Sequence, residues 1–213
     1  MPKLRSIKQL SEAEVEPVSL AAAKGQVGLL PEQGDDDALL LRLISTGRRL
    51  VEQRLGVTLA TRQFRATFEP NIQGYGHGHD HHHHDHTYYL GHGRLGLRIP
   101  APPLLVDGTH PLTITVSGVT ISSATYTIDS DSTPAVIRFS TWPAFDQDNP
   151  LVVTYWAGPA PGGRIEPAAE TVILLYLAHG FKHREVVVVG TISGPLPMGI
   201  ETLLASISVT GAY

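Results

Sequence analysis

One segment constrains the fold of this chain more than any other, the run Glu166–Glu185 (EPAAETVILLYLAHGFKHRE). Pro167 suits the first helical position, where proline removes only an N–H that has no partner inside the helix. Glu170 near the start and Lys182 near the end of the run complement the helix dipole. Its continuous apolar stretch, residues 172–178, is seven residues long, whereas a membrane span needs roughly 20. We therefore expect a helix that is buried over most of its surface inside a folded domain.

A second amphipathic helix is predicted over Ala38–Leu55. Asp35–Asp37 supply candidate N-caps, and Gly56 suits a left-handed C-terminal cap. Gly47 lies within the apolar stripe and weakens the helix by about 1 kcal/mol relative to alanine, so we expect another helix to approach closely there. The stripe repeats at steps of three and four: Leu40, Leu43, Ile44, Gly47, Leu50, Val51 and Leu55. The arginines of this helix form either a solvated face or a subunit interface: Arg42, Arg48, Arg49 and Arg54.

The N-terminal part of the chain carries weaker signals. Ser19 is a good N-cap for a short helix that Gly25 and Gly28 limit to two or three turns. Residues 1–16 are polar and show no periodicity, so we expect a flexible arm. They also lack the apolar core of a signal peptide, and we expect none.

Residues 58–158 have the pattern of antiparallel β structure, in which short strands alternate with turn signals rich in proline, glycine and aspartate. This spacing is typical of a sandwich-like insert. The expected strands are Thr61–Phe68, Arg94–Ile99, Leu112–Val116, Ala124–Ile128, Val136–Phe139 and Leu151–Trp156.

These elements predict an α+β fold, in which N- and C-terminal helices form a small α-helical bundle that carries a large antiparallel β insert. The helices 36–55 and 167–184 should pack together through a core that includes Leu43, Leu50, Val172, Leu175 and Tyr176. The expected organisation is an arm (1–16), a helical core (17–57 and 159–205), a β insert (58–158) and a C-terminal tail (206–213).

A histidine-rich segment, residues 74–93, interrupts the β region (GYGHGHDHHHHDHTYYLGHG). Histidine and aspartate are ligands for zinc, nickel and copper, but no ordered zinc-site spacing is present. We interpret the segment as an exposed connection between strands without a required metal, and keep a metal-binding protein as an alternative. Eight of the eleven histidines lie here: His77, His79, His81, His82, His83, His84, His86 and His92.

Other candidate sites have simple structural interpretations. His179 and His183 share one helical face, where we favour packing or capping over metal binding. Trp142-Pro143 and Tyr155-Trp156 suit core or edge packing, with a carbohydrate-binding β module as the alternative. The usual nucleophile, phosphate-loop, dinucleotide and zinc-protease motifs are missing from the sequence, so we predict no enzyme and no cofactor. Cysteine is absent, and the net charge of −4 does not indicate a nucleic-acid-binding domain.

The order of these pieces resembles one family, the head–tail connector proteins of long-tailed phages, also called adaptor or head-completion proteins, which include the adaptor of gene transfer agents. The resemblance spans about residues 16–205 and lies in order and spacing rather than in any single motif. The histidine-rich segment departs from it. The matching stretches are Glu16–Lys24, Asp36–Leu40, Val51–Gly56, Trp142-Pro143, Val153–Gly158, Pro167, Ile173–Leu175, Ala178-His179, His183–Glu185 and Leu196-Pro197.

The resemblance implies a structural protein of the virion neck. Such adaptors form a ring, expected to be dodecameric, beneath the portal; they extend the DNA channel and join the capsid to the next component, a stopper or tail terminator. DNA is expected to pass through without specific binding, which suits a chain of mildly acidic charge. We expect assembly in the host cytoplasm and no membrane partner. The resemblance also places portal contact in the C-terminal part, for which Ile207, Val209 and Tyr213 are the candidates.

Overall fold

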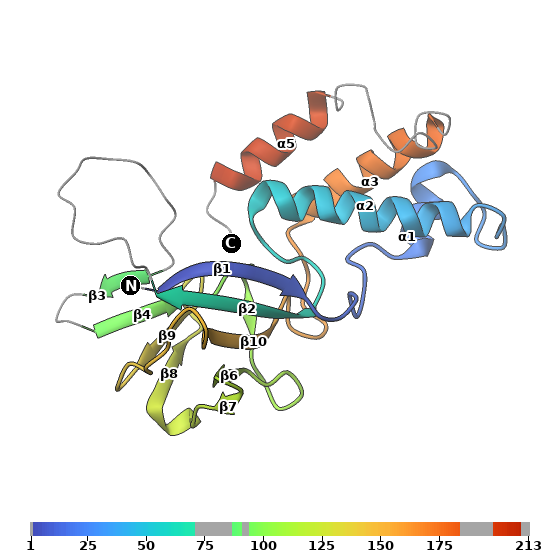
Figure 1. The fold of residues 1–213 in the computed structure, drawn as a ribbon. Helices are drawn as coiled ribbons and strands as arrows, with labels where there is room; N and C mark the ends of the chain where they lie inside the picture. Colours follow the sequence, from blue (N-terminus) through green and yellow to red (C-terminus); the bar gives the residue numbers. More distant parts are fainter. Residues whose placement is uncertain (1, 71–86, 91–93, 184–197, 210–213) are drawn as a thin grey trace. The chain divides into compact units, whose positions relative to one another are not determined.

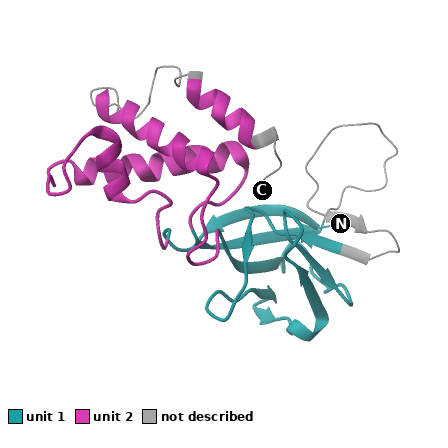
Figure 2. Cartoon of the chain, turned by 180° about the vertical axis from the view of Figure 1, so that it is seen from behind, with its two compact units in different colours: residues 1–13, 61–158 teal, residues 14–60, 159–213 magenta. Residues whose placement is uncertain are grey.

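The computed structural model describes residues 2–70, 87–90, 94–183 and 198–209 (Figure 1). The chain forms two compact units (Figure 2). Unit 1 contains Met1–Ala13 and Thr61–Gly158, and unit 2 contains Glu14–Ala60 and Pro159–Tyr213. In the described parts of the chain, the β-strands lie in unit 1 and the α-helices in unit 2. The predicted fold class, an α+β chain in which N- and C-terminal helices flank an antiparallel β insert, is confirmed.

Unit 1 consists of two antiparallel sheets. The larger, sheet A, has the order β1-β2-β10-β6-β7, and β5 pairs with one end of β10. The smaller, sheet B, has the order β3-β4-β9-β8. The strands of sheet A are β1 (Pro2–Gln9), β2 (Arg62–Pro70), β5 (Leu104–Leu105), β6 (Thr113–Val116), β7 (Val119–Thr120) and β10 (Leu151–Ala157). Those of sheet B are β3 (Thr87–Leu90), β4 (Arg94–Arg98), β8 (Tyr126–Asp129) and β9 (Val136–Phe139), with a 3-10 turn, Ser123–Thr125, before β8.

The two sheets share one hydrophobic core, as the sandwich prediction requires. Alternate residues of β2 and β10 are buried, so each strand turns one face to the core and the other outward. Tyr155 is fully buried and stacks on Phe64 with ring centroids 5.9 Å apart. Its hydroxyl donates a hydrogen bond to the carbonyl of Pro100 at 2.8 Å, and burial raises the pKa of Tyr155.

The expected flexible arm is wrong for Pro2–Gln9, which form β1 and pair with β2. The register changes between Leu4 and Ser6, and Ile7 remains 43% exposed. Only the first part of this edge strand has a covered face, where Pro2 is buried and Leu4 packs against the core. Backbone pairing to β2 holds the rest, so the strand shows no clean alternation of apolar and polar residues. The six expected strands are present, except that Ala124 and Thr125 lie in the 3-10 turn.

Unit 2 contains four described helices: α1 (Leu20–Val27), α2 (Asp37–Leu55), α3 (Pro167–Lys182) and α5 (Met198–Val209). The predicted caps are confirmed at two positions. The Ser19 hydroxyl accepts a hydrogen bond from the Ala22 N–H at 3.1 Å, and Gly56 ends α2 in the left-handed conformation with φ of 69°. None of the helices that the structure describes is long and apolar enough to cross a membrane.

Helices α2 and α3 pack closely because each presents a glycine to the other. A Cβ atom on Gly47 would lie 3.2 Å from Tyr176 Cδ1 and 3.3 Å from Ile173 Cγ2. A Cβ atom on Gly180 would lie 2.7 Å from Leu43 Cδ2. The predicted close approach at Gly47 is therefore confirmed, and Gly180 is its counterpart on the other helix.

The expected burial of α2 and α3 needs two corrections. Leu43, Val172 and Tyr176 are buried as predicted, but Leu50 and Leu175 are only half-buried at the margin of the core. Nor is α3 fully covered over most of its surface. Its buried residues form a single stripe at steps of three and four: Ala169, Val172, Ile173, Tyr176, Leu177 and Gly180. The remaining apolar residues widen this stripe rather than forming a second one.

The boundary of the predicted tail is also corrected, because α5 continues to Val209. Ile200, Leu204 and Ile207 are buried at steps of four and three, so the stripe that begins before residue 206 extends into the region expected to be a tail. A helix over Met198–Ala205 is predicted from the sequence, but residues 206–213 taken alone contain only the end of its stripe, which explains why the last turn was assigned to the tail.

We expect Ile207→Ala to lower the free energy of unfolding of unit 2 by about 2–4 kcal/mol, because Ile207 is 3% exposed within the helical core. Urea titration followed by circular dichroism at 222 nm measures this loss. Ser206→Ala, a change at an exposed position of the same turn, serves as the control and should stay within about 0.5 kcal/mol of the wild type. Equal stability of the two variants would contradict the packing of α5.

Candidate interaction surfaces

The residues proposed for portal contact do not form a described surface. Ile207 is buried in the core of unit 2 and is therefore unavailable to a partner while α5 remains packed. The side chain of Val209 and all of Tyr213 lie outside the described residues. Assignment of Ile207 to an interface is thus wrong for the folded subunit, because its apolar side chain serves the helical core.

The arginines of α2 divide into two groups. Arg42, Arg49 and Arg54 are exposed in the subunit, which is compatible with either alternative, a solvated face or a subunit interface. Arg48 is 3% exposed and forms a buried ion-pair cluster instead. Its Nε and Nη2 donate to the Glu16 carboxylate at 2.7 and 3.2 Å, and its Nη1 donates to Glu52 at 3.0 Å. Neither predicted role, solvated face or subunit interface, applies to Arg48.

The Arg48 cluster holds together two segments that are distant in sequence. Glu16 precedes α1, whereas Glu52 accepts a hydrogen bond from the backbone N–H of Leu59, beyond the end of α2, at 2.8 Å. Burial by itself lowers the pKa of Arg48, but the hydrogen bonds and charges of the two glutamates outweigh it and raise the pKa above its usual value. The cluster is a structural clamp at the point where the chain enters and leaves the N-terminal half of unit 2.

The histidine sites do not form a metal centre in the described residues. The rings of His179 and His183 lie 4.7 Å apart at the end of α3, where the His183 N–H donates to the His179 carbonyl. Within the described ranges, no three histidine, cysteine, aspartate or glutamate residues are grouped so that they could hold a metal ion. The histidine-rich segment is not a connection throughout, because Thr87–Leu90 form β3 and pair with β4. Residues 74–86 and 91–93 lie outside the described ranges, so their interpretation stays a prediction.

The aromatic residues singled out from the sequence pack within unit 1. Trp142 contacts Phe139 edge-on, with centroids 4.9 Å apart, and lies 6.2 Å from Phe145. Trp156 contacts the buried His110 edge-on at 5.0 Å. These contacts agree with the packing interpretation of both tryptophans.

His110 belongs to a closed loop that Asp107 organises. The Asp107 carboxylate lies 2.9 Å from His110 Nδ1 and accepts hydrogen bonds from the backbone N–H groups of Thr109 and His110 at 2.8 Å. The interactions with His110 and Thr109 hold the pKa of Asp107 well below its usual range. The Asp107 carboxylate is thus bound within its own loop, and its pairing with His110 serves to hold that loop together.

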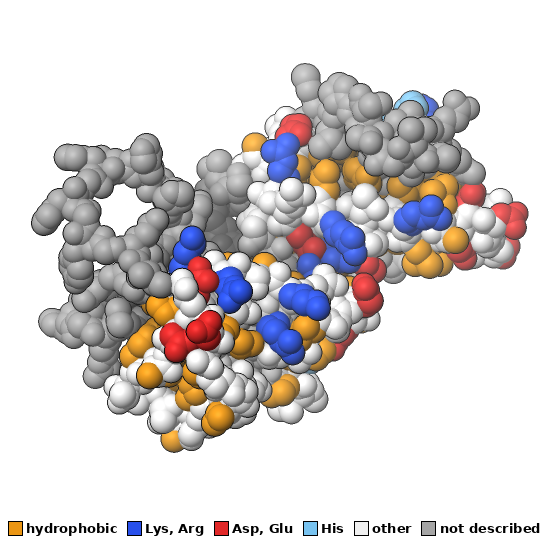
Figure 3. Space-filling view, in the orientation of Figure 1, with side chains coloured by type: hydrophobic (Ala, Val, Ile, Leu, Met, Phe, Trp, Pro, Cys, Tyr) orange, Lys and Arg blue, Asp and Glu red, His pale blue; other side chains and the backbone are white. Residues whose placement is uncertain are grey.

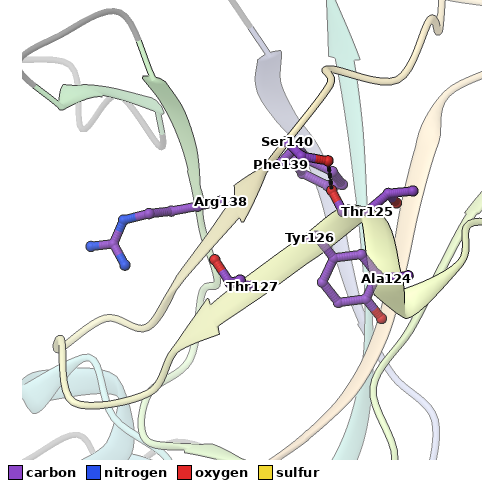
Figure 4. A pocket seen from close by; sticks show the side chains of 7 residues that line it. All are labelled: Ala124, Thr125, Tyr126, Thr127, Arg138, Phe139 and Ser140. Atoms are coloured by element: carbon purple, nitrogen blue, oxygen red, sulfur yellow. Dashed lines mark hydrogen bonds between the residues drawn. The ribbon is translucent and has the colours of Figure 1, made fainter.

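A pocket of about 270 Å³ lies at the β8–β9 edge of sheet B (Figure 4). Its charged lining residue, Arg138, is bound through Nη2 to Asp129 at 2.6 Å. The Ser140 hydroxyl donates to the Thr125 carbonyl at 2.8 Å (Figure 4). The lining residues are Ala124, Thr125, Tyr126, Thr127, Arg138, Phe139 and Ser140. The serine and the arginine of this pocket are thus engaged in contacts within unit 1.

One surface was missed by the sequence analysis, the outward face of sheet A. Lysine and arginine side chains gather over β1 and β2 (Figure 3). Lys3, Lys8 and Arg65 are exposed, and the pairing register places all three on the side opposite the core. We call this surface the basic face. It consists of the three cations and the outward hydroxyl residues in register with them: Lys3, Lys8, Arg65, Ser6, Thr67, Thr113, Thr115, Thr120 and Thr154. Two of its three cations come from β1, a strand that the sequence did not predict. The charged residues at positions 3–8 were the feature of the sequence that could have indicated this face.

The comparisons with known proteins give a clear result for the fold. No model of a known family matches the sequence, and no curated protein matches it. A chain in the structure of the neck of an empty gene transfer agent (GTA) particle, computed with C6 symmetry, matches with a TM-score of 0.66, 16% identity and coverage of 94% of both chains. The chain has the fold of a gene transfer agent neck protein.

Two further structures agree with the neck-protein fold. A chain of the native GTA virion matches with a TM-score of 0.62 and 15% identity. A chain of the native GTA neck, computed with C12 symmetry, matches with a TM-score of 0.63 and 12% identity. Each match covers 94% of this chain and 93% of the other, so it spans both units. The predicted resemblance to the connector family is confirmed at the level of the fold.

Proposed function

We propose that this protein is a structural subunit of the neck of a phage or gene transfer agent particle, where it acts as a head–tail adaptor. The observation that carries the proposal is the match over 94% of both chains to a neck structure. A match that includes both the helical unit and the β unit is more informative than one limited to a common small bundle. The symmetric neck reconstructions, with C6 and C12 symmetry, support a ring of identical subunits, and we propose a dodecamer.

The chemistry of the described residues is compatible with this role. Arg48 and its glutamates connect separate segments of unit 2, and Asp107 with His110 stabilises a single loop of unit 1. The aromatic residues serve the core of unit 1. The role of such a subunit is to present surfaces to its neighbours: in our proposal these are the portal above, a stopper or tail terminator below, and adjacent copies in the ring.

Localisation and loss of the protein test this proposal directly. Antibodies carrying gold should label purified particles at the junction of head and tail, and particles from cells lacking the gene should be DNA-filled heads without tails. Restoring the gene on a plasmid should restore tail attachment. Label spread over the capsid or tail surface, or normal tailed particles without the protein, would show that the adaptor role is wrong.

A further inference from the structure

We propose that the basic face of sheet A binds the sugar–phosphate backbone of double-stranded DNA without sequence preference. This inference deepens the proposed neck function and rests on it for its biological setting. It names the surface of the subunit that contacts the DNA passing through the particle.

The pairing register defines this face. Arg65 lies between the buried Phe64 and Ala66, so its side chain points away from the core. Lys8 is the direct partner of Arg65 on β1, and Lys3 is the partner of Glu69, four residues further along β2. Residues opposite each other in a pair, and residues two apart along a strand, share one side of the sheet. Lys3, Lys8 and Arg65 therefore share the outward side.

The charge arrangement on this face opposes folding. Lys8 and Arg65 are like charges directly opposite each other, an arrangement that destabilises an antiparallel pair. Among the described residues, no carboxylate lies within ion-pair distance of Lys3, Lys8 or Arg65. The one acidic residue in the strands of sheet A, Glu69, is the direct partner of Lys3 and therefore shares the outward side with it; its carboxylate approaches Arg5 at 4.0 Å. A local conflict such as that between Lys8 and Arg65, for which the described residues offer no compensating ion pair, indicates a surface retained for function.

Hydroxyl groups continue the face beyond the cations. The same register carries the outward side across sheet A, from Arg65 to Thr154 on β10 and Thr113 on β6. A parallel row runs from Ser6 through Thr67 and Val152 to Thr115 and Thr120. Lysine, arginine, serine and threonine are the side chains that contact DNA phosphates.

The spacing of the cations favours a long polyanion over a short acidic peptide. Lys3 and Lys8 lie on the order of 15 Å apart along β1, at about 3.3 Å per residue. DNA presents one charge per 3.4 Å of axis on each strand, so a single duplex supplies phosphates to all three cations at once. Contacts to phosphates do not distinguish one base sequence from another, so they are compatible with DNA that moves along the surface.

The test is a salt titration of DNA binding by the purified full-length chain. Fluorescence anisotropy with a labelled 30-bp duplex of arbitrary sequence gives the affinity at several salt concentrations. We expect binding at about 50 mM salt, an at least tenfold loss in the triple variant Lys3→Gln, Lys8→Gln, Arg65→Gln, and a log–log salt slope shallower by about 2–3, since each phosphate contact contributes about 0.9. Circular dichroism confirms that the variants are folded.

A matched variant controls for net charge. This control is a triple variant that removes three exposed cations from unit 2: Arg42→Gln, Arg49→Gln and Arg164→Gln. We expect its affinity for the duplex to change by less than about threefold. Equal losses in both variants, no binding by the wild type at low salt, or loss of ring assembly rather than of DNA binding in the triple variant would each overturn the proposal. Ring assembly and gold labelling are separate measurements, so failure of the neck function is distinguishable from failure of DNA binding.

Discussion

Replacement of Gly158 by alanine should lower the stability of unit 1 by about 3–5 kcal/mol. Gly158 has φ of 131°, a conformation that side-chain-bearing residues rarely adopt. A Cβ atom there would lie 2.6 Å from the Cα and 2.7 Å from the backbone nitrogen of Thr61. Because both atoms belong to the backbone, no side-chain rotation can relieve the clash. The Gly158 N–H also donates to the Pro103 carbonyl at 2.9 Å, which limits any shift of its own backbone.

Tryptophan fluorescence during urea unfolding measures this effect selectively, because both tryptophans of the chain, Trp142 and Trp156, lie in unit 1. Gly108→Ala is the matched control: it lies in the same unit, its φ is not in the left-handed region, and an added Cβ would meet open space. We expect the control to stay within about 0.5 kcal/mol of the wild type. A Gly158→Ala variant as stable as the control would show that β2 and β10 do not approach in this way.

The elements that sequence reasoning predicted well are those whose signals are local. The stripe of α2 and its glycine cap lie within one stretch of chain, and the unusual Gly47 correctly indicated a close neighbour. The alternating residues of β2 and β10 likewise reveal which side is buried before their partners are known. In each case a single segment contains the whole pattern.

The elements that were missed depend on partners far away in the sequence. Strand β1 is held by pairing with β2, about 60 residues later, and residues 1–16 alone do not reveal this. The burial of Arg48 follows from Glu16, 32 positions earlier, as well as from its helical neighbour Glu52. A charged residue at a helical step is normally interpreted as exposed, and only the tertiary fold adds the second carboxylate, that of Glu16, to the one that helix spacing supplies.

The candidate site was less predictable than the fold for the same reason. Ile207 was assigned to a partner because residues 206–213 were predicted to form a tail beyond the helical core, yet residues 206–209 continue α5, whose packing buries Ile207 in that core. The basic face could not be identified without the register of β1, since Lys8 and Arg65 become neighbours only through strand pairing. Surfaces assembled from several strands leave only a weak trace in sequence periodicity.

The Arg48 cluster gives the second large effect: Arg48→Met should lower the stability of unit 2 by about 3–5 kcal/mol. Methionine retains much of the apolar stem but removes the positive charge, which leaves the carboxylate of Glu52, 7% exposed, without its cation. Glu52 cannot turn to solvent easily, because it also accepts the Leu59 N–H. Circular dichroism at 222 nm during urea unfolding reports this loss, since the described α-helices all lie in unit 2.

Two further variants separate the loss of charge pairing from a general effect of the substitution. Arg49→Met changes the exposed neighbour on the same helix and should alter stability by no more than about 0.5 kcal/mol. Adding Glu52→Gln to Arg48→Met should recover part of the loss, because glutamine removes the unpaired charge while its carbonyl oxygen still accepts the Leu59 N–H. If the double variant is less stable than Arg48→Met, the cost arises from lost packing rather than from a stranded carboxylate, and the clamp has a different physical basis.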